Sequence, residues 1–312
     1  MLRAAATPSI IKHVVTQITV TGRAGLVAAL ALLVAPQWGG RAACHAASQN
    51  ERVRAELVAD VSTIAPGQSF QLGVRLTMEE SWHVNWSNPG DAGLAPTVQW
   101  RLPQGFTADI LQWPHPGHFA VGPLVIFGYA DHVLLTARVT APPHLPQNGR
   151  IALGAAVSWV ACGNSRVPGG GTLSLELAVG NRAVSERTSR WFEDARQSVP
   201  VSSTTWRMVG WYQDAQTIVF EMQSDDPAAP VLTDVFFYPY DAGIIVSSHP
   251  QPLARLVSNT TAGGYRLTID RDDMVAAKPA RLRGVIVSGS GWESKRNLRA
   301  LSVDILMLAE PQ

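Results

Sequence analysis

The sequence has 312 residues, of which 46% are hydrophobic and only 16% are charged. This amount of apolar material is enough for one large or two ordinary globular domains. Lysine and arginine total 25 against 24 aspartates and glutamates, and no basic patch stands out, which argues against nucleic-acid binding.

The first 46 residues predict a secretory signal peptide. Three basic residues, Arg3, Lys12 and Arg23, precede an unbroken apolar run over residues 24–35, and small residues follow as far as Ala46. This order is typical of export signals, and the apolar run is too short to span a bilayer comfortably. We therefore expect cleavage near Ala46 and an exported mature chain without a transmembrane segment.

Two other fates of the N-terminus stay open. The basic segment is unusually long, so an uncleaved membrane anchor is an alternative to cleavage. Cys44 could accept a lipid, but Arg41 stands where lipidation signals have an aliphatic residue. Cleavage near Ala46 would remove four of the 25 basic residues and none of the 24 acidic ones, which leaves a net charge of −3.

Residues 50–180 show a β pattern. Short runs that alternate apolar and polar residues, or that are rich in β-branched residues, are separated by Gly/Pro turns. The expected strands cover residues 53–61, 69–78, 97–102, 133–140, 151–159 and 172–179. Regular strands with almost no helical periodicity favour an antiparallel β-sandwich.

A single helix is expected within residues 185–200, because Trp191, Phe192 and Ala195 form a narrow apolar stripe that Pro200 closes. Strands then resume over residues 205–211, 217–223, 232–239, 265–269, 282–288 and 298–308. The sequence therefore predicts an all-β protein. Two immunoglobulin-like antiparallel β-sandwich domains, residues 50–180 and 203–310, are joined by a short helix.

The stretch most suggestive of chemistry is residues 158–168, SWVACGNSRVP, which follows an apolar strand. A cysteine at the end of a strand, entering a Gly/Asn/Ser loop, can be held rigidly and still be reached by a partner. Cys162 is also the only cysteine that would remain after cleavage near Ala46. Whether it is reactive or merely a small buried apolar residue stays open.

Residues 82–93, WHVNWSNPGDAG, form the second informative stretch. Trp82 and Trp86 can be interpreted as core residues of a structural corner or as an aromatic wall beside a site. The structural interpretation is favoured, since no partner for such a wall is evident from the sequence.

Five phrases, in this order and spacing, resemble the N-terminal periplasmic domain of the DsbD thiol:disulfide interchange reductases, and most closely its ScsB-like branch. They are residues 82–96, 111–116, 122–124, 127–129 and 158–162. The likeness covers residues 55–180, and residues 236–245 resemble the second sandwich of that branch. It implies an immunoglobulin-like domain with a redox cysteine pair, which takes electrons from a membrane domain and passes them to exported disulfide-handling proteins. No cofactor is implied.

The resemblance also implies a cap segment that shields the cysteines, and residues 119–127 match it. The candidate cap and partner-binding residues are Phe119, Gly122, Phe127, Tyr129, Trp82 and Trp86.

Two departures from the family pattern matter. The branch's site reads cysteine, three residues, cysteine, and then a proline two residues further on. Cys162 and Pro168 match this frame, but Arg166 occupies the position of the second cysteine. The membrane domain and the thioredoxin-like domain of the family are also not matched. Since a second thiol normally resolves the mixed disulfide, Cys162 alone would stall there unless an outside thiol intervened.

Cys162 is nevertheless the candidate nucleophile. If Arg166 lies nearby, its positive charge would favour the thiolate. His115 and His118, with His83 and His132 elsewhere, could suggest a metal site, but no Cys/Met-rich cluster supports one, so none is expected.

Three hypotheses follow. The first is a periplasmic accessory module that binds a thioredoxin-like or disulfide-handling partner, with a separate membrane reductase as a further partner. The second is a single-cysteine thiol–disulfide exchanger that an external thiol resolves. The third is a ligand- or carbohydrate-binding sandwich that uses exposed tryptophans.

Overall fold

The computed structural model describes residues 49–50, 52–146, 149–256, 264–273, 278–294 and 297–310. These residues all belong to one compact unit. The expected signal peptide, with Cys44, lies outside the described residues. Within the described ranges, no helix has both the length and the apolar character that crossing a bilayer requires.

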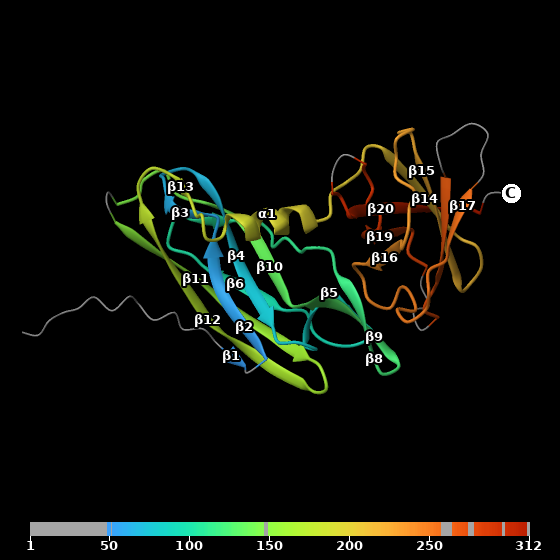
Figure 1. The fold of residues 1–312 in the computed structure, drawn as a ribbon, viewed down its shortest axis with the longest axis horizontal. Coiled ribbons are helices and arrows are strands. Elements are labelled where there is room, and N and C mark those ends of the chain that lie inside the picture. Colours follow the sequence, from blue (N-terminus) through green and yellow to red (C-terminus); the bar gives the residue numbers. More distant parts are fainter. Residues whose placement is uncertain are drawn as a thin grey trace, which may run out of the picture. The chain divides into compact units, whose positions relative to one another are not determined.

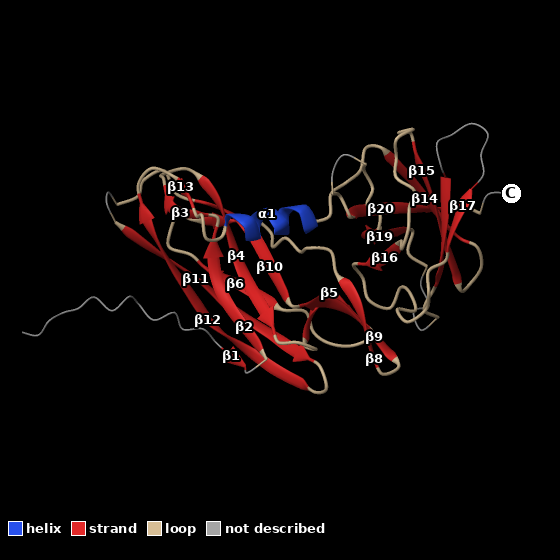
Figure 2. Cartoon of the chain, viewed as in Figure 1, coloured by secondary structure: helices blue, strands red, loops and turns tan. Residues whose placement is uncertain are grey.

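The first part of the chain, residues 49–184, is called here the N-terminal β region, and it forms two sheets (Figures 1 and 2). Its strands are β1 (Gln49–Asn50), β2 (Val53–Ala59), β3 (Val61–Ile64), β4 (Ser69–Met78), β5 (His83–Gly90), β6 (Thr97–Arg101), β7 (Thr107–Ala108), β8 (Gly117–Val121), β9 (Leu124–Ala130), β10 (His132–Thr140), β11 (Arg150–Cys162), β12 (Arg166–Val179) and β13 (Ala183–Val184). One sheet has the order β1-β2-β4-β10-β7. The other has the order β13-β3-β12-β11-β5-β9-β8, with β6 beside β11.

Helix α1 (Ser189–Ser198) follows, and residues 206–308 form the C-terminal β region. Its strands are β14 (Trp206–Tyr212), β15 (Thr217–Ser224), β16 (Phe236–Pro239), β17 (Leu253–Leu256), β18 (Gly264–Asp270), β19 (Arg281–Val287) and β20 (Ala300–Leu308). They form one sheet in the order β16-β19-β20-β14-β15-β18-β17.

The expectation of a mostly β chain with one short helix is confirmed. Alternation places Phe70, Leu72, Val74 and Leu76 of β4 in the interior, as a strand with one buried face requires. The sheets of the N-terminal β region contribute side chains to a shared hydrophobic core. Strands β5, β8 and β9 were not among the predicted runs, because the Asn, Pro, Gly and His residues in and around them hide the alternation.

The helix begins at Ser189, later than the expected start at residue 185. Residues 185–188 form a turn instead, in which the backbone N–H of Thr188 donates to the carbonyl of Ser185 at 3.2 Å. The Thr188 hydroxyl donates to the Ala59 carbonyl, so it ties the turn to the end of β2 rather than capping the helix. The predicted apolar stripe is used as expected, since Phe192 packs in a buried cluster on the N-terminal β region.

Strand β5 bends sharply, and this bend shapes the site. It pairs with β9 from His83 to Asn85, and then the register shifts so that Gly90 lies opposite Ile126. A β-bulge of this kind turns a strand and redirects its side chains. At Gly128 of β9 a Cβ would lie 2.2 Å from the Val84 carbonyl oxygen, so only glycine permits this close approach of β9 to β5.

Candidate functional site

Cys162 is the last residue of β11, and strands on either side place a side chain next to it. Across the β11–β12 hairpin its partner is Arg166, and across the β11–β5 ladder its partner is His83. Residues directly opposite each other in antiparallel strands project to the same face of the sheet. Arg166, Cys162 and His83 therefore form one row across three strands, called here the Cys162 row.

The Cys162 thiol points into the protein and is only 3% exposed. Its Sγ lies 3.8 Å from Asn85 Oδ1, to which the thiol donates a weak hydrogen bond. Asn85 is fully buried, and its Nδ2 donates to the Ala92 carbonyl at 3.2 Å. A Cβ at Gly93, whose φ is +119°, would lie 2.4 Å from the Asn85 amide, so this glycine makes room for it. The two informative stretches of the sequence thus meet at Asn85 and Cys162.

Burial and charge act in opposite directions on this thiol. Burial raises the pKa of Cys162, and the nearby Arg166 guanidinium lowers it by a smaller amount, so the pKa lies above its ordinary value. Arg166 itself is exposed. The thiol is therefore protonated at neutral pH in this structure: Arg166 acts in the expected direction, but burial has the larger effect on the pKa.

His83 is buried beside the thiol. Burial lowers the pKa of its imidazole, which is therefore neutral near pH 7. In the described part of the chain, its Nε2 has no hydrogen-bond partner. Such a ring nitrogen is costly to bury and is available to a polar group that enters the site.

The hairpin formed by β8 and β9, called here the cap hairpin, covers this row at His83. The Phe119 ring stacks on the His83 ring, with centroids 5.4 Å apart and planes 13° from parallel. Gly122 occupies the turn with φ +61°, and a Cβ added there would meet no atom within 4 Å. A hollow of about 280 Å³ lies between Phe119 and the loops that carry Trp82 and Gly163.

The other predicted cap and partner-binding residues lie largely in the core. Trp86 is 1% exposed, Phe127 is fully buried, and the buried Tyr129 hydroxyl donates to the Pro114 carbonyl at 2.7 Å. Trp82 is also buried, with the Arg52 guanidinium 5.2 Å from its ring centroid. Trp82 and Trp86 therefore lie in the core in this structure, in line with the structural interpretation. Of the predicted cap and partner-binding residues, only Phe119 and Gly122 are accessible to solvent.

The sequence analysis does not predict that His83 and Asn85 lie next to Cys162. Both residues belong to the informative stretch 82–93, but nothing within that stretch indicates which of its side chains face Cys162. The contact between Asn85 and Cys162 joins residues 77 positions apart.

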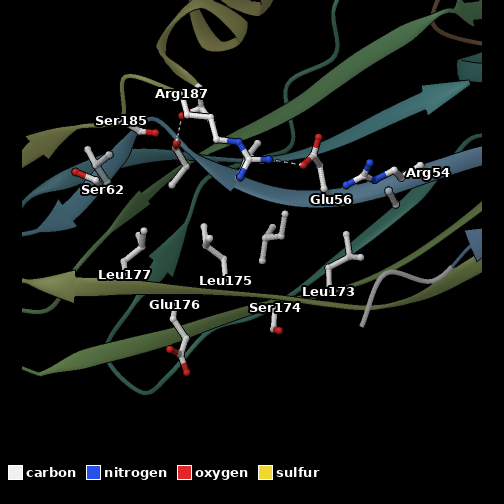
Figure 3. A pocket seen from close by; sticks show the side chains of 16 residues that line it. Arg54, Glu56, Ser62, Leu173, Ser174, Leu175, Glu176, Leu177, Ser185 and Arg187 are labelled. Atoms are coloured by element: carbon white, nitrogen blue, oxygen red, sulfur yellow. Dashed lines mark hydrogen bonds and ion pairs between the residues drawn. The ribbon is translucent and has the colours of Figure 1, made fainter. Parts of the chain in front are cut away.

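A second hollow, of about 380 Å³, lies between β2 and β12 (Figure 3). Leucines 173, 175 and 177 line one wall, and Arg187 pairs with Glu56 at 3.2 Å across from them. None of the Cys162 row lines it. Within the described residues, no three His, Cys, Asp or Glu side chains are grouped closely enough to hold a metal ion.

The described tryptophans offer no exposed platform. Each of them is buried or only partly exposed. A carbohydrate-binding surface needs open aromatic faces, so this state does not support the third hypothesis.

These features define a class of protein: it is rich in β-strands and has a buried thiol at the end of a strand, beside a hairpin that covers the neighbouring histidine. Residues 49–167 match the family described as "Thiol:disulfide interchange protein DsbD, N-terminal". This part of the chain belongs to the DsbD N-terminal domain family, as the sequence phrases predicted.

The fold is similar to that of the N-terminal periplasmic domain of ScsB from Proteus mirabilis. The TM-score is 0.56 at 18% identity, and the match covers 83% of this chain and 95% of that one. Residues 49–184 are less than half of the chain, so this likeness includes the C-terminal β region. A protein of unknown function from Porphyromonas gingivalis W83 also matches, at 12% identity over 82% of this chain and 100% of that one, but its TM-score of 0.23 carries no structural argument. No curated protein matches the sequence significantly.

Proposed function

We propose that this protein is an exported accessory module of a periplasmic thiol–disulfide system. It is built from two immunoglobulin-like β-sandwiches, residues 50–180 and 203–310, and it docks on a thioredoxin-like or other disulfide-handling protein through the surface around Cys162. One observation carries the proposal: a DsbD N-terminal family domain has Arg166, rather than a second cysteine, directly opposite Cys162.

Two further observations support the location. The solved protein of similar fold is described as a periplasmic domain of ScsB. The first 46 residues of this chain have the order of an export signal. A separate membrane reductase would then be a second partner.

The proposed chemistry uses one sulfur. The Cys162 thiolate attacks one sulfur of a partner disulfide, a new S–S bond forms between the two proteins, and the second partner sulfur leaves as a thiolate. Release needs another thiolate to attack this mixed disulfide. Across the hairpin, Arg166 cannot do so, because a guanidinium is not a thiol. The module therefore binds and is captured, but does not complete electron transfer unaided.

The experiment follows from this chemistry. The unaltered exported protein should accumulate mixed disulfides in cells, since it holds no resolving thiol opposite Cys162. Cells are quenched in acid, free thiols are alkylated, and adducts on the Cys162 peptide are identified by mass spectrometry. The matched control is Cys162→Ser, which keeps the size of the side chain and removes the sulfur.

A protein adduct on Cys162 that disappears in Cys162→Ser is the expected result. Free Cys162 under all conditions would contradict the covalent step. If the same partner then co-purified with both forms, only the docking part of the proposal would stand. Repeated reduction of a substrate disulfide by the purified protein, without an added thiol, would overturn the proposal as a whole.

The single-cysteine exchanger is the second candidate, because the Arg166 charge acts on the thiol in the direction that favours the thiolate, although burial has the larger effect on the pKa of Cys162 in this structure. In this case an external thiolate such as glutathione attacks the mixed disulfide and releases the Cys162 thiolate. Multiple turnovers that require both glutathione and Cys162 would support the exchanger. A stoichiometric reaction that stops after one adduct would exclude it.

A further inference from the structure

The C-terminal β region contacts the elements that build the Cys162 site. The ring contacts between the two β regions join strands β5, β8 and β9 with strand β16 and the adjacent Tyr240. β5 supplies His83 to the Cys162 row, and β8 and β9 are the cap hairpin. The second β region is therefore packed against the strand that flanks the thiol and the hairpin that covers the neighbouring His83.

Strand β8 presents two consecutive rings to opposite sides. Phe119 stacks on His83, while His118 stacks on Phe236 of β16 with ring centroids 4.9 Å apart. Successive side chains of a strand point to opposite faces, so one strand can cover the Cys162 row and be held from behind at the same time.

Two kinds of contact hold the outer face of the hairpin. His118 Nδ1 and the Tyr238 hydroxyl share a hydrogen bond of 2.9 Å. The buried Phe127 ring of β9 meets the Tyr238 ring edge-on at 5.0 Å and the Phe236 ring edge-on at 6.0 Å. Edge-on aromatic pairs stabilise a packed interface beyond the apolar area that they bury. Lifting the cap hairpin would break these contacts together with the Phe119–His83 stack.

We propose that strand β16 is a latch for the cap hairpin, with Tyr238 and Phe236 as positioning residues that keep Phe119 over His83. The latch sets how often the hairpin opens and therefore how often Cys162 can be reached. This proposal gives the C-terminal β region a role, which the proposed function does not. It rests on the same Cys162 site as the proposed function, but its test needs no partner protein, so either proposal can fail without the other.

The test measures the rate at which a small alkylating reagent modifies Cys162 in the folded full-length chain, read on the Cys162 peptide by mass spectrometry. Tyr238→Phe keeps the ring and removes the hydroxyl that bonds His118. Phe236→Ala removes the stacking ring. Phe119→Ala opens the cap directly and serves as the positive control.

Tyr212→Phe is the matched control. Its hydroxyl bonds the Pro279 carbonyl at 2.9 Å within the C-terminal β region, and it lies outside the latch. We expect the labelling rate to rise about threefold for Tyr238→Phe and about tenfold for Phe236→Ala, as for single weak and strong contacts in an interface. The rate for Tyr212→Phe should equal that of the unaltered protein.

Hydrogen exchange separates a released latch from general destabilisation. In Tyr238→Phe and Phe236→Ala, faster exchange should be confined to residues 117–130 and the facing strand β16. Faster exchange over the whole chain would overturn the proposal, because the thiol would then be reached by global unfolding. Unchanged labelling rates in both Tyr238→Phe and Phe236→Ala would also overturn the proposal. An unchanged rate in Phe119→Ala would do the same, because it would show that the Phe119 ring does not restrict access to Cys162.

Discussion

At the scale of single residues, burial and a nearby charge shift the pKa of the Cys162 thiol in opposite directions. Its burial favours the neutral thiol, while the exposed Arg166 across the hairpin favours the thiolate, and burial has the larger effect on the pKa. The buried amide of Asn85 accepts a hydrogen bond from the thiol and so also suits the protonated form. The thiol of Cys162 is therefore buried and protonated in this structure, and a partner would have to uncover it.

The pH dependence of alkylation tests this balance. Because burial raises the pKa of Cys162, the half-maximal alkylation rate of the folded protein should lie at higher pH than that of the urea-unfolded chain. Arg166→Gln removes the group that lowers this pKa and should move the midpoint higher still. Arg101→Gln, an exposed arginine on β6, should leave it unchanged. A folded midpoint below the unfolded one would show an activated thiol instead.

The same shift has a consequence for stability. A thiol whose folded pKa lies above its unfolded pKa binds its proton more tightly in the folded state. Its contribution to the free energy of unfolding is therefore full below the ordinary thiol pKa, and it is lost as the pH rises through the folded value. The free energy of unfolding, measured with urea, should therefore fall between pH 7 and alkaline pH. This fall should be smaller in Cys162→Ala than in the unaltered protein, because the variant has no thiol to ionise.

The position of Arg166 leads to a third prediction at the residue scale. Directly opposed residues in antiparallel strands have Cα atoms about 4.5–5.5 Å apart, which falls within the range that a disulfide spans. Arg166→Cys should therefore form a disulfide with Cys162 on mild oxidation, seen as a loss of two hydrogens in the mass of the hairpin peptide. Val167→Cys, one residue further along β12, faces the other side of the sheet and should not. Two free thiols in Arg166→Cys after oxidation would contradict this register.

At the scale of elements, short strands position the Cys162 site, and one helix stabilises a different sheet. Asn85 lies two residues after His83 in the regularly paired part of β5, so it faces the same side of the sheet, towards Cys162. Glycines at 93 and 128 permit the close approaches that this geometry needs. Helix α1 instead stabilises the opposite sheet. Its Phe192 packs with Val58 and Leu134 in a buried cluster.

Phe192→Ala should lower the free energy of unfolding by about 3–5 kcal/mol, because it removes a buried ring and leaves a cavity against β2 and β10. Urea denaturation measures this change. Arg190→Ala, whose side chain is 90% exposed on the same helix, should change the stability by less than about 0.5 kcal/mol. Equal effects of the two substitutions would show that the apolar stripe of the helix does not brace the sheet.

At the scale of the whole molecule, the two β regions are joined by more than helix α1. Asn88, at the bend of β5, is 3% exposed, and its Nδ2 donates to the Pro239 carbonyl at 2.8 Å and to the Asp241 carbonyl at 3.3 Å. Its Oδ1 accepts from the Gly90 backbone N–H at 3.1 Å. A single buried amide therefore fixes the bend of β5 and also bonds the C-terminal β region.

Asn88→Ala should lower the free energy of unfolding by about 1–3 kcal/mol, because it leaves the buried Pro239 carbonyl without its donor. It should also separate the unfolding of the two β regions into resolvable transitions, since fewer contacts would couple them. Urea unfolding followed by tryptophan fluorescence and by hydrogen exchange measures both effects. Asn164→Ala, an exposed asparagine of the β11–β12 loop, is the control. One cooperative transition at an unchanged midpoint would contradict the coupling.

The sequence by itself determined the β character, the approximate position of the helix and the stretch that carries the thiol. Each is a local property: period-two alternation along β4, an apolar stripe at Trp191 and Phe192, and a cysteine separated from an arginine by the three residues of a Gly/Asn/Ser turn. The phrases around residues 82–96 and 158–162 also indicated the family, which the match over residues 49–167 shows.

The tertiary structure alone decided what surrounds the sulfur. Asn85 reaches Cys162, Phe119 covers His83, and Tyr238 meets His118 across 120 positions of sequence. Such contacts depend on strand register and on the bend of β5, which no short window of sequence contains. For the same reason the direction of the pKa shift at Cys162 could not be foreseen: the sequence gives a nearby positive charge, but burial is a property of the packed fold.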